Sequence, residues 1–361
     1  MSPAVHQLVP SMVPHDATAD HTLQVQLALQ QAGYESEVFA LAVHPSLEDR
    51  VRLAHELPGP RPGAHLLYQY SSCSPLADLL LSRHEPVALD YHNVTPASFF
   101  HRWDRSIWLA LCAARVQLDQ LARRQPLGVC DSAFNADDLA GHGVARTTVV
   151  PVLVDVAAFD AEPDRARAEA LERRRAGGGT SWLFVGAVSP HKAQHELVQA
   201  LACYRRSVDP QARLVLVGRP IAPAYAAAVH RLVAELGLTG AVDVVGEATH
   251  AELVAHYRHA DVFVTASRHE GFCVPLLEAM AHDLPVVARA AGAVPDTVGD
   301  AGVLVDGGGW ALAAAVARVV GDGTLRRRLV AAGQRRLEAF SLARSRAALV
   351  TAVRRWTAGA L

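Results

Sequence analysis

The segment that decides the fold is RHEGFCVPLLEAM, at residues 268–280. It follows a short apolar run, VFVT at residues 262–265, that has the length and composition of a buried strand. Pro275 suits the first turn of a helix, and the apolar residues after it continue with helical spacing. The segment therefore predicts a strand, a loop with Glu270, and a helix with Glu278, which is the repeating unit of a parallel sheet.

The same alternation extends outward through the second half of the chain. We expect strands at residues 181–185, 213–217, 242–245, 262–265, 285–288 and 303–305, separated by helices at 193–206, 225–236, 251–257 and 275–281. Strands that are apolar throughout, alternating with helices, indicate a parallel sheet covered on both faces.

The first half of the chain repeats this pattern less regularly. We expect strands at residues 6–9, 37–41, 65–70, 87–91, 128–130 and 148–150, and helices at 22–32, 104–124 and 133–141. Asp20 is the predicted cap of the first helix. Residues 151–180 lose the pattern and are expected to connect the two halves, and residues 322–357 are predicted to be helical. The fold class is therefore α/β with two Rossmann-like domains, whose ligands bind at the carboxyl ends of the strands.

Composition excludes several classes of protein. The net charge of −2 provides no general attraction to nucleic acid, and 51% hydrophobic residues suffice for two buried cores. We find neither a secretory signal nor an apolar run long enough to span a membrane, and the five cysteines lack metal-ligand spacing. These observations predict a cytoplasmic protein without a metal site.

The scarcity of certain residues singles out candidates. Lys192 is the only lysine, and Asn93 and Asn135 are the only asparagines, as expected if the coding sequence is GC-rich. Where arginine replaces lysine generally, a remaining lysine is either a chance survivor on the surface or a site that needs a compact ammonium.

Three loops at the carboxyl ends of predicted strands carry the candidate chemistry. The first, FVGAVSPHK at residues 184–192, ends in Lys192, which can pair with a diphosphate. The second contains Glu270, followed by a helix start that can bind phosphate and by Glu278, which can accept hydrogen bonds from ribose hydroxyls. The third, DYHNVTP at residues 90–96, contains His92. Each also has an ordinary structural interpretation, since surface glutamates and structural histidines are common. His250, His256 and His259 are expected to be exposed helix residues.

The spacing Glu270–x7–Glu278 resembles the motif of glycosyltransferase family 4, whose members are retaining enzymes of the GT-B fold. Residues 181–306 resemble this family throughout, and residues 91–96 and 131–135 resemble it more loosely. The resemblance implies two domains facing across a cleft. An acceptor-binding domain would span residues 1–160, a nucleotide-sugar domain 161–340, and a helix at 341–361 would return to the first domain.

The resemblance also implies roles by position. His92, Lys192 and Glu270 would be catalytic, with His92 beside the reacting face of the sugar and Lys192 on the donor diphosphate. Asp16, Asn93 and Asn135 would lie on the acceptor side. The donor-binding set would be Gly186, Lys192, Arg219, Arg268, Glu270, Gly271, Phe272, Cys273, Val274 and Glu278.

Three departures from the family pattern stand out. Ala187 occupies the position of an arginine, so a diphosphate cation is missing unless Arg219 or Arg268 replaces it. Cys273 occupies the position of a glycine, and residues 15–17 (HDA) replace a Gly-Gly loop.

The expected activity is hexose transfer, with retention, from a UDP- or GDP-sugar to a sugar or lipid-linked hydroxyl acceptor. No cofactor or metal is expected, and the arginines of the last helix give only a weak signal for peripheral membrane contact. Two alternatives remain open, namely a sugar-nucleotide epimerase of the same fold and an inactive partner subunit.

Overall fold

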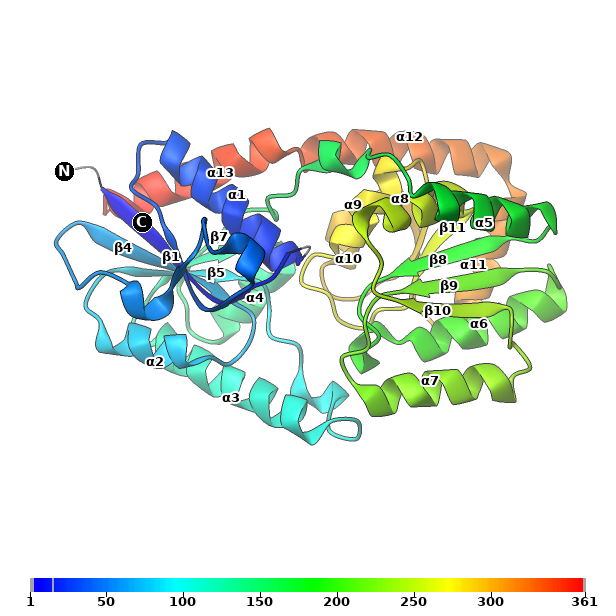
Figure 1. Cartoon of the computed structure of the whole chain (residues 1–361), viewed down its shortest axis with the longest axis horizontal. Coiled ribbons are helices and arrows are strands. Elements are labelled where there is room, and N and C mark those ends of the chain that lie inside the picture. The colour runs from blue at the N-terminus through cyan, green and yellow to red at the C-terminus, as the bar shows by residue number, and fades with distance from the viewer. Residues whose placement is uncertain (1–2, 15, 360–361) are drawn as a thin grey trace. The chain divides into compact units, whose positions relative to one another are not determined.

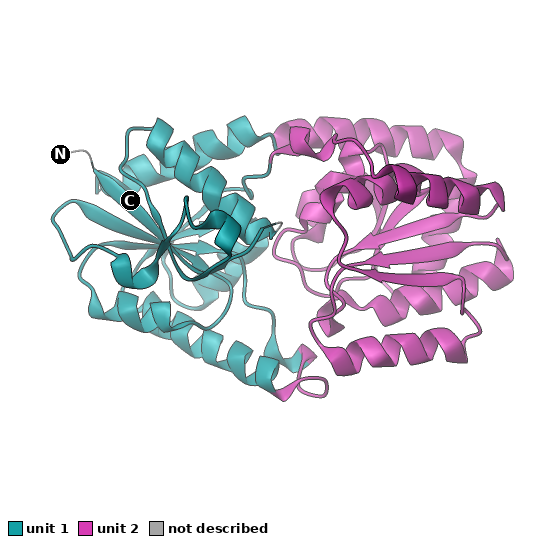
Figure 2. Cartoon of the chain, in the orientation of Figure 1, with its two compact units in different colours: residues 1–98, 106–154, 340–361 teal, residues 99–105, 155–339 magenta. Residues whose placement is uncertain are grey.

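The structure is a computed structural model that describes residues 3–14 and 16–359, so His15 lies outside the described residues. It divides into two compact units, each described here by itself (Figure 2). Unit 1 comprises residues 1–98, 106–154 and 340–361, and unit 2 comprises residues 99–105 and 155–339. The sequence predicted an uninterrupted first domain over residues 1–160. The structure instead assigns 99–105 and 155–160 to unit 2, because Phe100 and Trp103 pack against side chains of that unit.

Unit 1 is built on one parallel sheet in the order β3-β2-β1-β4-β5-β6-β7 (Figure 1). Every strand pairs parallel to its neighbour, so all the strands end at the same edge. The strands are β1 (Ala4–Met12), β2 (Val38–Val43), β3 (Arg52–Leu53), β4 (Ala64–Tyr70), β5 (Val87–Tyr91), β6 (Leu127–Cys130) and β7 (Arg146–Val149).

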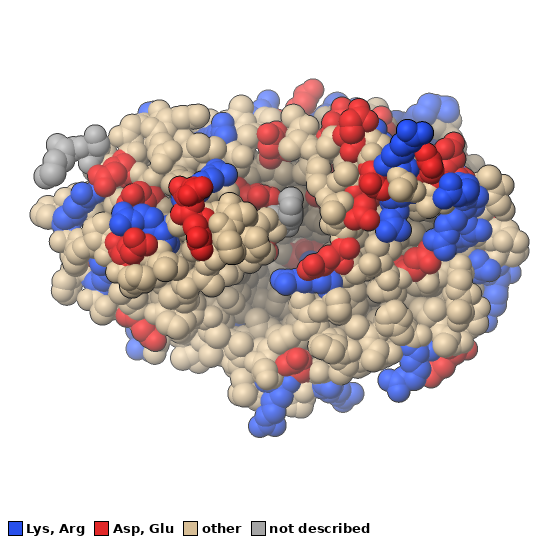
Figure 3. Space-filling view, viewed as in Figure 1, with Lys and Arg blue, Asp and Glu red and all other residues tan. Residues whose placement is uncertain are grey.

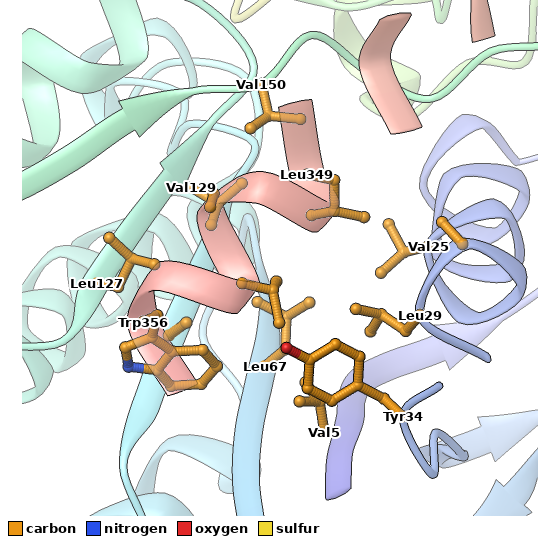
Figure 4. Packing of buried hydrophobic residues seen from close by; sticks show 14 of the residues in the cluster. Val5, Val25, Leu29, Tyr34, Leu67, Leu127, Val129, Val150, Leu349 and Trp356 are labelled. Carbon is orange, nitrogen blue, oxygen red and sulfur yellow. The ribbon is translucent and has the colours of Figure 1, made fainter. Parts of the chain in front are cut away.

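Helices cover both faces of this sheet. They are α1 (Ala17–Gln31), α2 (Pro75–Ser82), α3 (Arg105–Ala122), α4 (Ala133–Gly141) and α13 (Leu342–Thr357). Helices α1 and α13 pack together on one face, where Leu349 and Trp356 of α13 join a buried cluster with strand residues such as Leu67 and Val129 (Figure 4). The last helix is thus part of the core of unit 1, although the preceding 185 residues of chain, 155–339, belong to unit 2.

Helix α1 begins earlier than the sequence predicted. Asp16, not Asp20, is the cap: its carboxylate accepts hydrogen bonds from the backbone N–H groups of Thr18 and Ala19. Asp20 lies in the first turn, where a negative charge favours the helix dipole without capping it.

Unit 2 contains a second parallel sheet, in the order β10-β9-β8-β11-β12-β13. Its strands are β8 (Ser181–Val185), β9 (Arg213–Val217), β10 (Val242–Gly246), β11 (Val262–Thr265), β12 (Val286–Arg289) and β13 (Gly302–Val305). Its helices are α5 (Arg165–Ala176), α6 (Gln194–Ser207), α7 (Pro223–Glu235), α8 (His250–His259), α9 (Val274–Ala281), α10 (Val294–Val298), α11 (Gly309–Gly321) and α12 (Gly323–Ala339). The predicted α/β class with two parallel Rossmann-like sheets is confirmed.

Two predictions about unit 2 are wrong. Residues 151–180 are not free of regular structure, because α5 forms there and packs on α8. Helix α5 buries no side chain, and ion pairs such as Arg175–Asp261 hold it in place. His256 is not an exposed helix residue but only 4% exposed, and burial lowers its pKa to about 4.

The helical prediction at residues 322–357 corresponds to two helices. The helix is interrupted at Phe340 and Ser341, where α12 of unit 2 ends and α13 of unit 1 begins.

Positive and negative side chains are interspersed over the face drawn in Figure 3. None of the described helices combines the length and the hydrophobicity needed to cross a bilayer.

We expect Leu349→Ala to destabilise unit 1 by about 2–5 kcal/mol, because Leu349 is fully buried and its truncation leaves a cavity. Hydrogen exchange should show faster exchange in β1 and β4, with β8 and β11 changed less. Arg355→Ala, on the exposed face of the same helix, is the control. Equal protection in both variants would contradict the placement of α13 in the core of unit 1.

Candidate active site

The loop after β8 carries the only lysine of the chain. It leaves the sheet at Gly186 and forms a single 3-10 turn, Pro190–Lys192, before α6. Gln194 fastens this loop, because its side chain donates to the carbonyl of Ala187 at 2.8 Å and accepts from the N–H of Ser189 at 3.3 Å. The backbone N–H of Arg268 donates to the carbonyl of His191 at 2.8 Å, which joins this loop to the one after β11.

The two loops meet at an ion pair. Nζ of Lys192 donates to Oε2 of Glu270 at 2.6 Å. Burial by itself would lower the pKa of Lys192, but the Glu270 carboxylate raises it on balance, so the ammonium form is favoured. An ammonium has three N–H donors, and Glu270 occupies one of them. The pair thus orients a cation while leaving it with donors for a further ligand.

Gly292 supports the backbone of Glu270. It adopts φ +57°, and a Cβ at this position would lie 2.5 Å from the carbonyl oxygen of Glu270. The next residue, Ala293, donates its backbone N–H to that carbonyl at 2.9 Å, and Thr297 donates its hydroxyl to the carbonyl of Phe272 at 2.8 Å. The turn before α9 is therefore held by the segment that follows β12.

Cys273 immediately precedes α9 and has a left-handed backbone, with φ 75°. This conformation is costly for a residue with a Cβ, which explains why a glycine suits the position. Burial and the Glu270 carboxylate raise the pKa of the Cys273 thiol well above its usual range. The thiol is therefore protonated at neutral pH and is a poor nucleophile. In the first turn of α9, Pro275 has no N–H and Leu276 donates its N–H to the Cys273 carbonyl at 3.1 Å, so the backbone N–H of Val274 is the donor of this turn that can face an anion.

Glu278 lies one turn into α9 and is half-buried. Its Oε2 accepts a hydrogen bond from the hydroxyl of Tyr257 on α8 at 2.6 Å. Burial raises the pKa of Glu278, and the Tyr257 hydroxyl partly offsets this. One carboxylate oxygen is thus committed to Tyr257, and the other is the candidate acceptor for ligand hydroxyls.

The two arginines considered as replacements for the missing cation differ in their partners. Arg268 pairs with Glu196 of α6 at 2.7 Å, and Arg289 at the end of β12 contacts the other oxygen of the same carboxylate. Arg219, at the end of β9, is exposed, and its backbone carbonyl accepts from the N–H of Val188 at 2.9 Å. Arg219 therefore lies in the loop after β9, next to the loop that begins at Gly186, and its side chain forms no ion pair with any residue in the described ranges.

An aromatic segment from residues 99–105 also packs on the loop of Lys192. The ring of Phe100, which is 1% exposed, lies 5.9 Å from that of His191, and Trp103 lies edge-on to Tyr225 at 5.2 Å. His191 is buried, and burial together with the neighbouring Lys192 charge lowers its pKa well below the ordinary value. His191 is therefore a neutral residue that packs between residues 99–105 and the loop of Lys192.

In unit 1, His92 follows β5 and is almost buried. Its Nδ1 lies 2.9 Å from Oδ2 of Asp131, and its Nε2 lies 2.6 Å from Oε1 of Gln69. Burial lowers the pKa of His92, but the Asp131 carboxylate outweighs this and raises it to about 9. The protonated form of His92, at the carboxyl edge of the sheet, is thus favoured at neutral pH.

The residues predicted for the acceptor side have local structural contacts. Asn93, with φ 73°, donates its amide to Oδ1 of Asn135 at 3.0 Å, and Asn135 donates to the carbonyl of Tyr91 at 3.1 Å. Both amides are buried, while Asp16 caps α1. The structure therefore gives these residues a role in shaping the loops, and their predicted contact with an acceptor stays a prediction.

His21, Asp90 and His92 place possible metal ligands within 4.8 Å of one another. These atoms are already used: Nδ1 of His21 accepts from the N–H of Leu153 at 2.9 Å, and Nε2 of His21 lies 3.0 Å from Asp90. A metal would have to displace those hydrogen bonds, so the arrangement fits a hydrogen-bonded cluster better than a metal site.

Several residues that shape these loops, each within its own unit, were not predicted from the sequence. Glu196, Gly292, Gln69 and His21 were not considered, and Asp90 and Asp131, which lie in the quoted segments 90–96 and 131–135, were given no role. The available signal was a polar residue within an apolar strand, as with Gln69 in β4 and Asp90 in β5.

Residues 172–336 match the family model described as "Glycosyl transferases group 1". Among curated proteins, the chain is 37% identical over 229 residues to a D-inositol 3-phosphate glycosyltransferase of Salinispora arenicola, covering 59% of this chain and 51% of that protein. It is 34% identical over 172 residues to a GDP-mannose-dependent alpha-(1-6)-phosphatidylinositol monomannoside mannosyltransferase of Mycobacterium tuberculosis, covering 45% of this chain and 43% of that protein. The chain thus spans about half the length of the curated relatives it matches.

Solved structures resemble the whole chain. Sucrose-phosphate synthase of Thermosynechococcus elongatus superposes with a TM-score of 0.77 at 20% identity, covering 99% of this chain and 100% of that one. Alr3699/HepE of Anabaena, in complex with UDP-glucose, superposes with a TM-score of 0.75 at 17% identity, covering 97% and 99%. At these identities the likeness shows the fold alone, and that fold is GT-B, as the sequence predicted.

Replacing Gly292 by Ala should displace the turn that contains Glu270, because the new Cβ would overlap the backbone carbonyl. Gly237→Ala is the matched control, since Gly237 has a similar φ of +67° but open space around it. Chemical unfolding should show a cost of about 1 kcal/mol for the control and a clearly larger one for Gly292→Ala. Equal costs would mean that backbone conformation alone matters at residue 292.

Proposed function

We propose that this protein, whose residues 172–336 match the model described as glycosyl transferases group 1, transfers a hexose from a nucleotide-diphosphate sugar to a hydroxyl acceptor. The observation that carries the proposal is the Lys192 ammonium held 2.6 Å from Glu270, next to the start of α9. A cation with remaining donors beside the N-terminus of a helix is suited to a diphosphate.

In the proposed reaction, Lys192 and the first turn of α9 bind the diphosphate of the donor. Negative charge grows on the diphosphate as the bond to the sugar breaks, so a fixed ammonium stabilises the transition state more than the ground state. The second oxygen of Glu270 accepts hydrogen bonds from sugar hydroxyls, and Glu278, oriented by Tyr257, accepts from the ribose.

We assign the missing second cation to Arg219 rather than to Arg268. Glu196 already pairs with Arg268, whereas Arg219 is exposed beside the Gly186 loop. Its flexible side chain can reach toward a diphosphate without breaking an existing ion pair.

The names of the relatives support a sugar donor activated by a nucleotide. One curated relative is named as GDP-mannose-dependent, and HepE was solved with UDP-glucose. We therefore propose a UDP- or GDP-sugar as donor and a small or lipid-linked polyol or sugar as acceptor. Retention at the anomeric carbon and independence from metals belong to the same proposal and rest on the sequence resemblance. A cytoplasmic location is proposed with them from the scattered cysteines.

The direct test is a thermal-shift screen of UDP, GDP and their hexose derivatives, because a ligand that binds only the folded state raises the melting temperature. We expect one nucleotide diphosphate and its sugar to raise Tm, with ADP as the control. Incubation with that sugar nucleotide should then release the free nucleotide slowly without an acceptor and rapidly with one. Formation of an epimer instead would identify an epimerase, and binding without any turnover would identify an inactive partner subunit.

Lys192→Ala should lower kcat about 10²–10³-fold, by analogy with the loss of one donor to a developing negative charge. The variant also leaves the buried Glu270 carboxylate unpaired, which costs about 3 kcal/mol of stability. The double variant Lys192→Ala/Glu270→Gln should recover most of that stability but bind the nucleoside diphosphate about 10–100-fold more weakly than the native protein.

Arg219→Ala should weaken the same binding, whereas Arg165→Ala, which removes an exposed cation of the same unit, should not. Calorimetric titration with the nucleotide selected by the screen measures both effects. If the double variant bound the nucleoside diphosphate as tightly as the native protein, Lys192 would not be part of the donor site.

A further inference from the structure

The side chains around His92 form one continuous hydrogen-bonded network in unit 1. It crosses four neighbouring strands, with Gln7 on β1, Gln69 on β4, Asp90 on β5 and Asp131 directly after β6. Gln7, Gln69 and Asp90 are at most 1% exposed, and Asp131 is 4% exposed. Because water cannot satisfy these groups, their mutual contacts determine where the protons lie.

The orientation of the Gln7 side-chain amide is fixed by a backbone carbonyl. Nε2 of Gln7 lies 3.1 Å from the carbonyl oxygen of Thr22, which can only accept, so this end of Gln7 is the NH₂ group. The oxygen Oε1 of Gln7 therefore faces Gln69, whose Nε2 lies 2.9 Å away.

The second amide is fixed by the first and by Asp90. Nε2 of Gln69 donates to Oε1 of Gln7 and, at 3.1 Å, to Oδ2 of Asp90. The opposite orientation would place the Gln69 oxygen against two acceptors. The oxygen of Gln69 must consequently face His92, from which it lies 2.6 Å away.

Both ring nitrogens of His92 therefore face groups that can only accept. Nε2 faces the Gln69 oxygen, and Nδ1 faces the Asp131 carboxylate at 2.9 Å. A neutral imidazole carries one bare lone pair, which would point at one of these oxygens. Two N–H groups satisfy both contacts at once.

The surrounding charges agree with this assignment. The Oδ1 atoms of Asp90 and Asp131 are buried without a hydrogen-bond partner in the described parts of the chain, so their negative charge needs a nearby cation. Asp16 adds a further negative charge that acts on His92. His21, whose ring centroid is 5.1 Å from that of His92, supplies no second cation in this arrangement, because Leu153 donates to its Nδ1 and its Nε2–H donates to Asp90.

We propose that His92 is held as an imidazolium whose two N–H groups are both engaged within unit 1, so that it is a fixed charge rather than a base or a donor to substrate. Gln69, Gln7 and Asp131 are the positioning residues that enforce this state. The effect on sugar transfer rests on the proposed function. In that reaction His92 has no lone pair for the acceptor proton, so the proton leaves with another group, such as the departing diphosphate oxygen.

The protonation state can be measured without any substrate. In ¹⁵N-histidine-labelled protein, the resonances of His92 are identified by their loss in His92→Gln. We expect both ring nitrogens to carry protons at pH 7.5 and one proton to be lost near pH 9, the value to which Asp131 raises the pKa of this buried histidine. An unprotonated ring nitrogen at pH 7.5, or a spectrum that changes when a chelator removes a bound metal, would overturn the proposal.

Asp131→Asn tests the positioning residue. It keeps an acceptor for Nδ1 but removes the charge, so the titration midpoint of His92 should fall by about one pH unit or more. The matched control is Asp119→Asn, which removes the carboxylate partner of His142 elsewhere in unit 1 and should leave His92 unchanged. An unchanged midpoint in Asp131→Asn would contradict the assigned role.

The stability of the folded protein should depend on pH through the protonation of His92. The pKa of His92 in the folded protein, about 9, lies above the ordinary 6.5, so its contribution is complete below pH 6.5 and is lost as the pH rises through 9. The difference in urea midpoint between the native protein and His92→Gln should shrink over that window. A constant difference would count against the imidazolium.

The pH dependence of sugar transfer is a further measurement, and a purely structural role of Asp131 would not change it. For Asp131→Asn, kcat should fall about threefold or more near pH 8.5, as the protonated fraction of His92 falls, and recover at lower pH, while KM for the donor stays within about twofold. If the native protein transfers no sugar, the proposed function fails, and the resonances still decide the state of His92. If it transfers sugar while His92 is neutral, only the present inference fails.

Discussion

The carboxyl edge of each sheet depends on one constraint, which is that a charge removed from water must be matched by an opposite charge. In unit 2, Glu270 is 6% exposed and pairs with Lys192, and Glu196 is 5% exposed and contacts both Arg268 and Arg289. These pairs connect the loops that follow β8, β11 and β12. Removing Lys192 would leave the buried Glu270 carboxylate unpaired, whereas Glu196 would keep one arginine if the other were removed, so these segments hold one another in position through electrostatics as well as through hydrophobic packing.

Unit 1 meets the same constraint in a different way. The cation is a histidine, and every N–H that it has is matched to an acceptor. Lys192 retains two donors beyond the one given to Glu270, whereas His92 retains none. Under the proposed function this difference has a consequence. The site in unit 2 can gain contacts as charge develops on a donor, while the cluster in unit 1 can contribute only a charge and a fixed shape.

The sequence predicted the strands well because buried parallel strands are uninterrupted apolar runs. All six strands in unit 2 were expected within one residue at each end, and β8, β9 and β11 were matched at both ends. Helix α5 was not predicted because it has no apolar face, and the ion pairs that it forms are with residues far away in the sequence. The meeting of Lys192 with Glu270 followed from the parallel topology, in which both loops leave the same edge. The protonation of His92 could not be predicted, because it depends on Gln69 and Asp131, which are 23 and 39 residues away in the sequence.

The rare residue types of this chain occur where their replacements would fail physically. Lys192, in the loop before α6, ends in a compact ammonium that contacts the buried Glu270 carboxylate, whereas a planar guanidinium would need more space and a different set of acceptors. Asn93 adopts φ 73°, a conformation that asparagine tolerates better than most residues with a side chain, and its amide meets that of Asn135, the only other asparagine. A carboxylate at either asparagine would remove the donor that the other amide or the Tyr91 carbonyl requires. Scarcity in composition thus marks positions where geometry, rather than charge or polarity alone, determines the residue.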